Sequence, residues 1–195
     1  MADPAYIVDG VLTDGEAWVA VASETIASPA TPVVFTSTDD GQVGDFSQYM
    51  DLVLIAYIRS QDTGDPWTYI SVNNSTAFTS QNQYFQGDGS SDSAGNSVGV
   101  AGKAWVWRHP YSTQTANAFG AAICTFFDIN SGKWKNMISQ SAADLDGSGY
   151  AFMAHNVIQT QAAISSIEIN DGAGSGWSIG SRFDLFGVLP RMVTA

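Results

Sequence analysis

The sequence contains few basic residues. Of its 195 residues only seven are Lys or Arg, whereas 19 are Asp or Glu, so the formal net charge at pH 7 is −12. The basic residues are scattered along the chain rather than clustered. A chain this acidic is repelled by phosphate backbones and by anionic lipid. We therefore expect neither a nucleic acid nor a membrane among its partners.

Cysteine is almost absent as well. The single cysteine, Cys124, excludes an intrachain disulfide and a cysteine-rich zinc site. It lies in the apolar run Ala121–Phe127, where cysteine behaves as a small hydrophobic residue. No basic N-terminal region precedes an apolar stretch, and no apolar run approaches membrane-spanning length. We expect synthesis as a soluble chain in the cytoplasm, which permits later assembly into a larger particle.

Helical periodicity is also missing, although residues 150–163 are ambiguous because they are rich in Ala, Met and Gln. Hydrophobic residues make up 45% of the chain and charged residues 13%, which is typical of a folded protein. Short apolar stretches separated by Gly, Ser, Asn and Asp predict an all-β, single-domain jelly roll or β-sandwich of about ten short antiparallel strands. The expected strands are residues 17–22, 31–36, 48–60, 67–72, 103–108, 118–127, 133–140, 150–157, 164–169 and 181–188.

The longest apolar run, within Gln48–Ser60, is expected to be the central strand. Successive side chains of a strand point to opposite faces, so Leu52, Leu54, Ala56 and Ile58 share one face, and Val53, Ile55 and Tyr57 share the other. A strand with water on one side alternates polar and apolar residues, but both faces of this strand are apolar. We expect both faces to be covered, by a second sheet and by another subunit, although interior packing explains the two apolar faces equally well. Arg59 and Ser60 are expected to bring the strand to the surface.

The polar stretch Gly87–Ser97 is expected to be an exposed loop because it is the longest low-complexity segment of the chain. Residues 1–16 combine a few apolar residues with Pro, Gly and Asp, which suggests an N-terminal arm. The expected organisation is an arm over residues 1–16, a sandwich domain over residues 17–188 and a C-terminal tail over residues 189–195.

No catalytic motif is present. The two histidines, His109 and His155, lie at expected strand ends, and the sequence contains neither a Gly-x-Ser-x-Gly elbow nor a His-Glu-x-x-His motif. The segment Asp144–Gly149 resembles the start of a calcium loop, but an EF-hand requires Glu at the position that His155 occupies. We expect no enzymatic activity, no bound metal and no cofactor.

The six tryptophans raise the possibility of sugar binding, because an exposed indole can stack on a pyranose ring. Trp18, Trp105 and Trp107 lie in expected strands, with Trp105 and Trp107 on one face, and are assigned to the core or to a subunit interface. Trp67, Trp134 and Trp177 adjoin turns and are the candidates for an exposed glycan platform. The competing interpretation is that these three side chains cap the core of the sandwich.

Four segments of the chain, taken in order, form a recognisable set, namely Tyr49–Ser60, Tyr84–Ser91, Ala162–Ile169 and Gly180–Val188. They resemble a family of small jelly-roll virion proteins of tailed, notably aquatic, bacteriophages. Members of that family have a strand with Asp-Leu at its start, then a Gly-Asp-Gly-Ser-Ser loop, and finally a closing strand of the form Gly-Ser-x-Phe-x-Leu-x-Gly. The resemblance covers roughly residues 24–188, and this chain departs from it in the N-terminal arm, in Trp105–Trp107 and after residue 188.

The resemblance implies a structural protein of the virion, and it provides no catalytic residues. The expected function is a capsid cement or decoration protein that binds the outer capsid surface as a homotrimer, with the major capsid protein as its partner. The alternative is a tail or fibre protein that binds a host-surface glycan. The arm provides the candidate partner-binding residues, which are Tyr6, Ile7, Val8, Val11 and Leu12.

Overall fold

The computed structural model describes residues 7–8, 11–12, 18–29, 32–75 and 79–189, and their fold is a β-sandwich. Twelve strands form the two sheets of the sandwich, and every pair of neighbouring strands is antiparallel. The prediction of an all-β sandwich is therefore confirmed. The part of the chain that the structure describes contains no helix long and apolar enough to cross a lipid bilayer.

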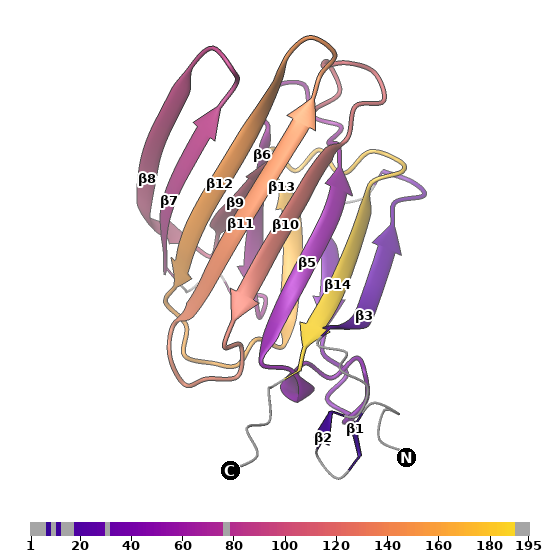
Figure 1. Cartoon of the computed structure of the whole chain (residues 1–195), viewed down its shortest axis with the longest axis vertical. Coiled ribbons are helices and arrows are strands. Elements are labelled where there is room, and N and C mark those ends of the chain that lie inside the picture. The colour runs from indigo at the N-terminus through magenta and orange to yellow at the C-terminus, as the bar shows by residue number, and fades with distance from the viewer. Residues whose placement is uncertain (1–6, 9–10, 13–17, 30–31, 76–78, 190–195) are drawn as a thin grey trace.

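The larger sheet has eight strands, and Figure 1 shows it face on. Its strands, in spatial order, are β3 (Trp18–Thr25), β14 (Arg182–Val188), β5 (Asp51–Ile58), β10 (Gly120–Phe127), β11 (Lys135–Asp144), β12 (Gly149–Ile158), β7 (Thr79–Gly87) and β8 (Asp92–Ala101).

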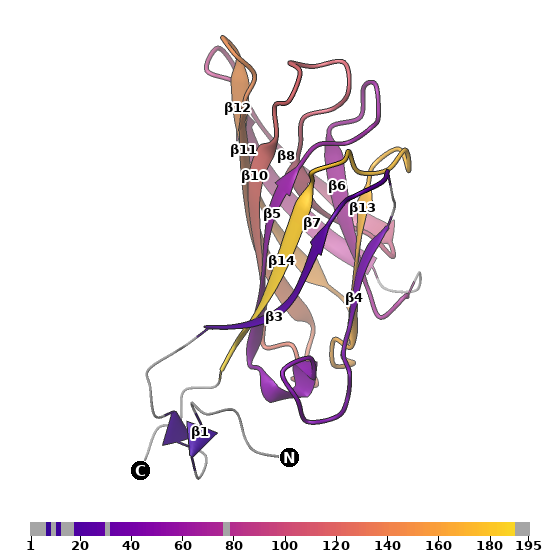
Figure 2. The same ribbon diagram turned by 90° about the vertical axis from the view of Figure 1, so that its right-hand side faces the viewer.

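The smaller sheet has four strands and packs against one face of the larger sheet, as Figure 2 shows in profile. A single turn of 3-10 helix, η1 (Phe46–Gln48), precedes β5. Two short strands, β1 (Ile7–Val8) and β2 (Val11–Leu12), pair with each other in a separate sheet. The strands of the smaller sheet, in spatial order, are β4 (Val33–Thr36), β13 (Ser166–Asp171), β6 (Trp67–Val72) and β9 (Ala104–Arg108).

The core lies between the two sheets, and β5 is an interior strand of the larger sheet, third of eight in spatial order. Leu52, Leu54 and Ile58 point into this core and are completely buried, as the alternation of the sequence predicts. The other face of β5 is different, because the side chain of Tyr57 is 53% exposed. The smaller sheet thus covers one face of β5, and the opposite face is the outer surface of the described sandwich.

Polar side chains in the core have a specific role at β9, an edge strand of the smaller sheet. The free edge of β9 faces the larger sheet, and side chains from that sheet satisfy its backbone groups. Asn156 Nδ2 donates to Trp105 O at 2.8 Å, and Ser139 Oγ donates to Val106 O at 2.6 Å. Ser141 Oγ accepts from the backbone N–H of Arg108 at 3.1 Å. These bonds remove the penalty of burying unpaired backbone groups at a strand edge.

A register shift between β6 and β9 corrects the prediction that Trp105 and Trp107 share a face. Trp105 is opposite Tyr69 and Trp107 is opposite Thr68, so the two tryptophans are paired with residues of opposite faces. Trp107 is fully buried and donates from Nε1 to Ile123 O at 2.9 Å, whereas Trp105 is only half-buried. The bulge reverses the simple alternation of side chains on β9.

Three further predictions are wrong. Most of the expected loop Gly87–Ser97 belongs to β8 and to the end of β7, and only the turn between them is outside a strand. Arg59 does not reach the surface but is buried at the end of β5. Leu189, the first residue of the expected tail, is buried in the core.

Candidate functional site

The outward face of the eight-stranded sheet, hereafter the outer face, is apolar and exposed. Side chains from six of its strands contribute to it. The most exposed are Phe85 on β7 at 59%, Tyr57 on β5 at 53% and Trp18 on β3 at 47%. Phe127 on β10, Ile138 on β11 and Met153 on β12 are exposed on the same face. Exposed polar side chains, among them Asn136, Gln140 and His155, lie between these apolar ones. Exposed apolar side chains spread over six strands are typical of an interaction site in a soluble protein.

The strand register explains a hollow in this face. Ala121 on β10 is opposite Ala142 on β11, Ala142 is opposite Ala151 on β12, and Ala151 is opposite Gly87 on β7. Residues that are directly opposite each other in antiparallel strands form one row across the sheet. These four neighbouring members of the row are all small, so this part of the sheet lacks large side chains.

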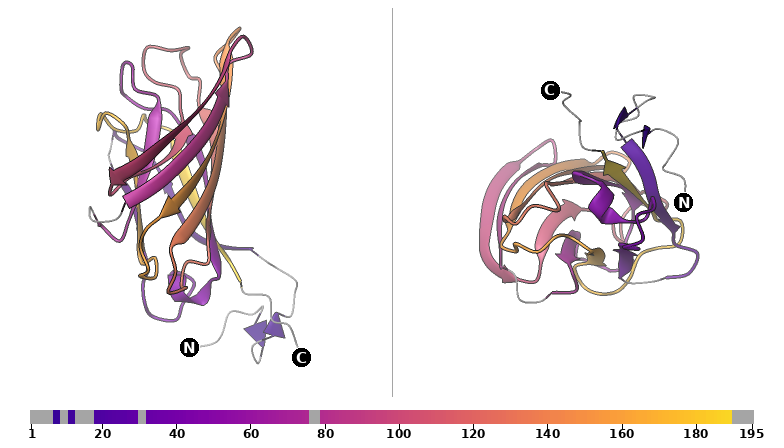
Figure 3. Two further views of the ribbon diagram at one scale, coloured as in Figure 1. Left: turned by 90° about the vertical axis from the view of Figure 1, so that its left-hand side faces the viewer. Right: turned by 90° about the horizontal axis from the view of Figure 1, so that it is seen from below.

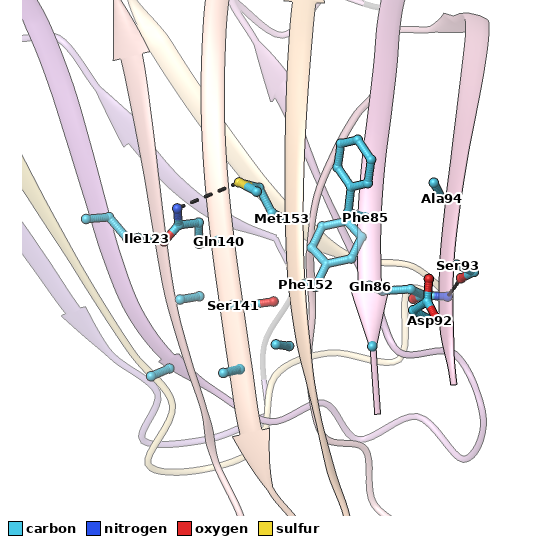
Figure 4. A pocket seen from close by; sticks show the side chains of 15 residues that line it. Phe85, Gln86, Asp92, Ser93, Ala94, Ile123, Gln140, Ser141, Phe152 and Met153 are labelled. Atoms are coloured by element: carbon cyan, nitrogen blue, oxygen red, sulfur yellow. Dashed lines mark hydrogen bonds between the residues drawn. The ribbon is translucent and has the colours of Figure 1, made fainter. Parts of the chain in front are cut away.

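The resulting depression, hereafter the alanine hollow, has a volume of ≈ 720 Å³. Larger side chains of the next row border it, namely Ile123, Gln140, Met153 and Phe85 (Figure 4). Gln140 Nε2 lies 3.8 Å from Met153 Sδ. In the row of the hollow itself, Tyr57 on β5 is opposite Ala121. The hollow therefore lies beside a protruding aromatic residue and can accept an apolar or aromatic group.

The outer face carries little charge. Arg182 Nε lies 2.9 Å from Asp184 Oδ2, and Ser23 Oγ donates to the same carboxylate at 2.7 Å. Partial burial raises the pKa of Asp184, but the bonds from Arg182 and Ser23 outweigh it and leave the pKa below its ordinary value. Asp51, Asp92 and Asp144 lie at the strand ends of the face, and Asp92 also lines the alanine hollow. Little of the chain's net charge of −12 therefore faces a partner bound here.

The two histidines lie in different environments. His155 is exposed on the outer face, on β12. His109 follows β9 and is completely buried, with Nδ1 2.8 Å from Thr68 Oγ1 and its ring 5.2 Å from that of Trp177. Burial lowers the pKa of His109 to about 3, so its imidazole is neutral at physiological pH. Among the residues described, no three His, Cys, Asp or Glu side chains are grouped so that they could hold a metal ion.

The three candidate tryptophans do not form one platform. Trp177 is fully buried against His109 and Phe183, so it is not part of an exposed platform and agrees with the interpretation that it caps the core. Trp134 is exposed in the turn between β10 and β11. Trp67, at the start of β6, is half-buried. Its ring contacts Tyr84, Trp105 and Phe152, and Arg108 lies 5.6 Å from it.

The candidate arm residues are described only in part. Tyr6 lies outside the described residues. Ile7 pairs with Leu12 and Val8 pairs with Val11, so these four residues form the hairpin of β1 and β2. Neither strand pairs with a described strand of the sandwich.

Sequence reasoning did not identify the outer face as a whole. One signal was present, because both faces of Leu52–Ile58 are apolar. The alanine hollow had no such signal, since Ala121, Ala142 and Ala151 become neighbours only through the pairing of three strands.

No protein-family model matches this chain, and no curated protein sequence is significantly similar to it.

Proposed function

We propose that this chain is a structural protein of a bacteriophage particle, a jelly-roll cement or decoration protein that binds the outer surface of the capsid as a homotrimer. The observation that carries the proposal is the exposed apolar outer face, which is suited to lasting protein contacts rather than to chemistry. The family resemblance of residues 24–188 indicates the virion as the place of those contacts.

The proposed mechanism is mechanical. A β-sandwich with a continuous core is a rigid body, because close-packed interiors are hard to deform. A rigid oligomer bound across the junctions of shell subunits adds interfaces that oppose the internal pressure of packaged DNA. The hairpin Ile7–Leu12 and the apolar residues of the N-terminal arm contact the major capsid protein in this proposal. Exposed acidic turns such as Asp88–Ser91 face the solvent and limit aggregation of particles.

The test is the copy number of the protein in purified particles, measured by quantitative mass spectrometry against the major capsid protein. We expect a number comparable to that of the shell protein. A few copies to a few tens would assign the protein to the tail, and complete absence from particles would refute both virion roles.

The exposure of Trp134 favours one second candidate, a tail protein that binds a glycan on the host surface. In that case Trp134→Ala reduces glycan binding strongly. Ile179→Ala is the matched control, because Ile179 is also an exposed hydrophobic residue but belongs to the loop between β13 and β14 and has no indole ring. If Trp134→Ala leaves glycan binding unchanged, Trp134 does not form the glycan-binding platform.

A further inference from the structure

We propose that the outer face binds further copies of this chain in a closed ring, in which Tyr57 of one copy inserts into the alanine hollow of the next. This inference deepens the proposed function, because it assigns the surface through which the proposed homotrimer forms. It rests on four features of the face, which are its charge, its area, its curvature and the register of its side chains.

Charge decides which surface of this chain can contact a copy of itself. Two chains of net charge −12 repel each other unless they meet through a surface that carries little of that charge. The outer face meets this condition, because Arg182 and Asp184 compensate each other and the middle rows of the face are neutral. A basic partner would instead require an acidic face.

The area of the face is sufficient for a ring when both contacts of each copy are counted. Eight strands about 4.8 Å apart span about 34 Å, and eight residues along a strand span about 26 Å, so the face covers about 900 Å². Stable protein complexes bury about 800 Å² of each partner. In a ring each copy divides this face between two neighbours, so each contact buries about 450 Å² of each partner and the three contacts of a trimer together bury about 2,700 Å². One contact alone is smaller than an ordinary stable interface, so the stability of the ring depends on closing all three.

The curvature of the sheet favours a ring over a face-to-face pair. Viewed along the strands, the eight-stranded sheet bends around the four-stranded sheet, so its outer face is convex (Figure 3, right). Two convex faces touch only along their centres. Around a symmetry axis parallel to the strands, each copy can instead present one flank to each neighbour. Such contacts join unlike surfaces and must close into a ring or grow into a filament.

The two flanks of the face are complementary. One flank, formed by β3, β14 and β5, carries the protruding Tyr57 and the aromatic pair Trp18 and Phe186, whose ring centroids are 6.0 Å apart. The other flank, formed by β12, β7 and β8, contains much of the alanine hollow and Phe85. Rotation about an axis parallel to the strands keeps each row of side chains at its own height. Tyr57 is in the row of the hollow, so this rotation brings it to the level of Ala151 and Gly87 of the next copy.

The first experiment measures molar mass by light scattering during size exclusion. We expect the native chain at about three times 20.7 kDa and Ala151→Arg, which fills the hollow with a charged side chain, at one chain mass. Val34→Arg is the matched control, because Val34 is also an exposed apolar strand residue but lies on the smaller sheet. The Val34→Arg variant is expected to keep the molar mass of the native ring. Circular dichroism and thermal unfolding establish that all three chains fold.

A cross-linking experiment tests the contact itself. The only native cysteine, Cys124, is buried, so introduced cysteines are the accessible ones. The double variant Tyr57→Cys, Ala151→Cys is expected to give a disulfide-linked trimer on a non-reducing gel, whereas either single variant gives monomer. A linked dimer as the final product would indicate a face-to-face pair and overturn the ring.

The inference is also overturned if the native chain is a monomer at 100 µM or if Ala151→Arg leaves the mass unchanged. The copy number in particles is measured separately from these masses. A ring without presence in particles would refute the proposed function alone, and a monomer that is abundant in particles would refute the inference alone.

Discussion

Arg59 is a buried cation that holds a loop, and its replacement should destabilise the sandwich. The side chain lies at the end of β5 and donates four hydrogen bonds to backbone carbonyls of the loop between β9 and β10. Nη1 donates to Thr115 O at 2.7 Å and to Ala118 O at 3.0 Å. Nη2 donates to Ser112 O and to Gln114 O, each at 3.1 Å. These four hydrogen bonds hold the loop between β9 and β10 against the end of β5.

The magnitude follows from these four bonds. A hydrogen bond from a charged donor contributes about 1.5–3 kcal/mol, but bonds that share one side chain are not additive. The carbonyls of Ser112 and Thr115 belong to exposed residues, so water can replace part of the loss. Arg59→Met also removes the cost of burying the charge. We expect a net loss of about 3 kcal/mol in the free energy of unfolding, equivalent to about 10 °C in Tm for a chain of this size.

The assay is urea unfolding followed by tryptophan fluorescence, together with hydrogen exchange of the amides in residues 112–118. Arg59→Lys keeps the charge but has only three donors, so it should lose about half as much stability. Lys133→Met is the matched control, because it replaces an exposed cation by the same side chain and should change stability by less than about 0.5 kcal/mol. The reasoning is refuted if Arg59→Met unfolds within about 0.5 kcal/mol of the native chain or leaves exchange of the loop unchanged.

Three further predictions concern the buried histidine, the cysteine and the arm. His109 is protonated near pH 6.5 in the unfolded chain but only near pH 3 in the folded chain, so the free energy of unfolding should fall by about 1.4 kcal/mol per pH unit as the pH falls through that window. Urea unfolding at several acidic pH values measures this slope. His109→Gln should lose this part of the slope, whereas the control His155→Gln, at an exposed site, should keep it. Burial raises the pKa of the Cys124 thiol, so a thiol reagent at pH 8 should react only at the rate of global unfolding, and fast labelling in native buffer would contradict this. Deletion of residues 1–16 should leave the unfolding midpoint unchanged, since β1 and β2 pair only with each other among the described strands, but should weaken binding to particles; native affinity would count against the arm as a contact.

The ten strands expected from the sequence are all present, because alternation of apolar side chains is a local property of a chain. The two strands of the sandwich that were missed, β7 and β8, lack this signal. Their residues Thr79–Gly87 and Asp92–Ala101 are mostly polar or small, and they are held in the sheet by backbone pairing with β12 and with each other. A strand that is stabilised by its neighbours' backbone cannot be recognised from its own side chains.

The sequence alone determined the class of the fold, the interior rather than edge position of Leu52–Ile58 and the apolar character of both faces of that strand, since all three follow from composition and period. The tertiary structure alone decided which face is covered. It also decided that Arg59 turns inward to bind loop carbonyls, and that Ala121, Ala142 and Ala151 form one row. These outcomes depend on the register of the strands and on how the sandwich closes. Both bring together residues that are far apart in the sequence, and no local pattern in the sequence indicates such contacts.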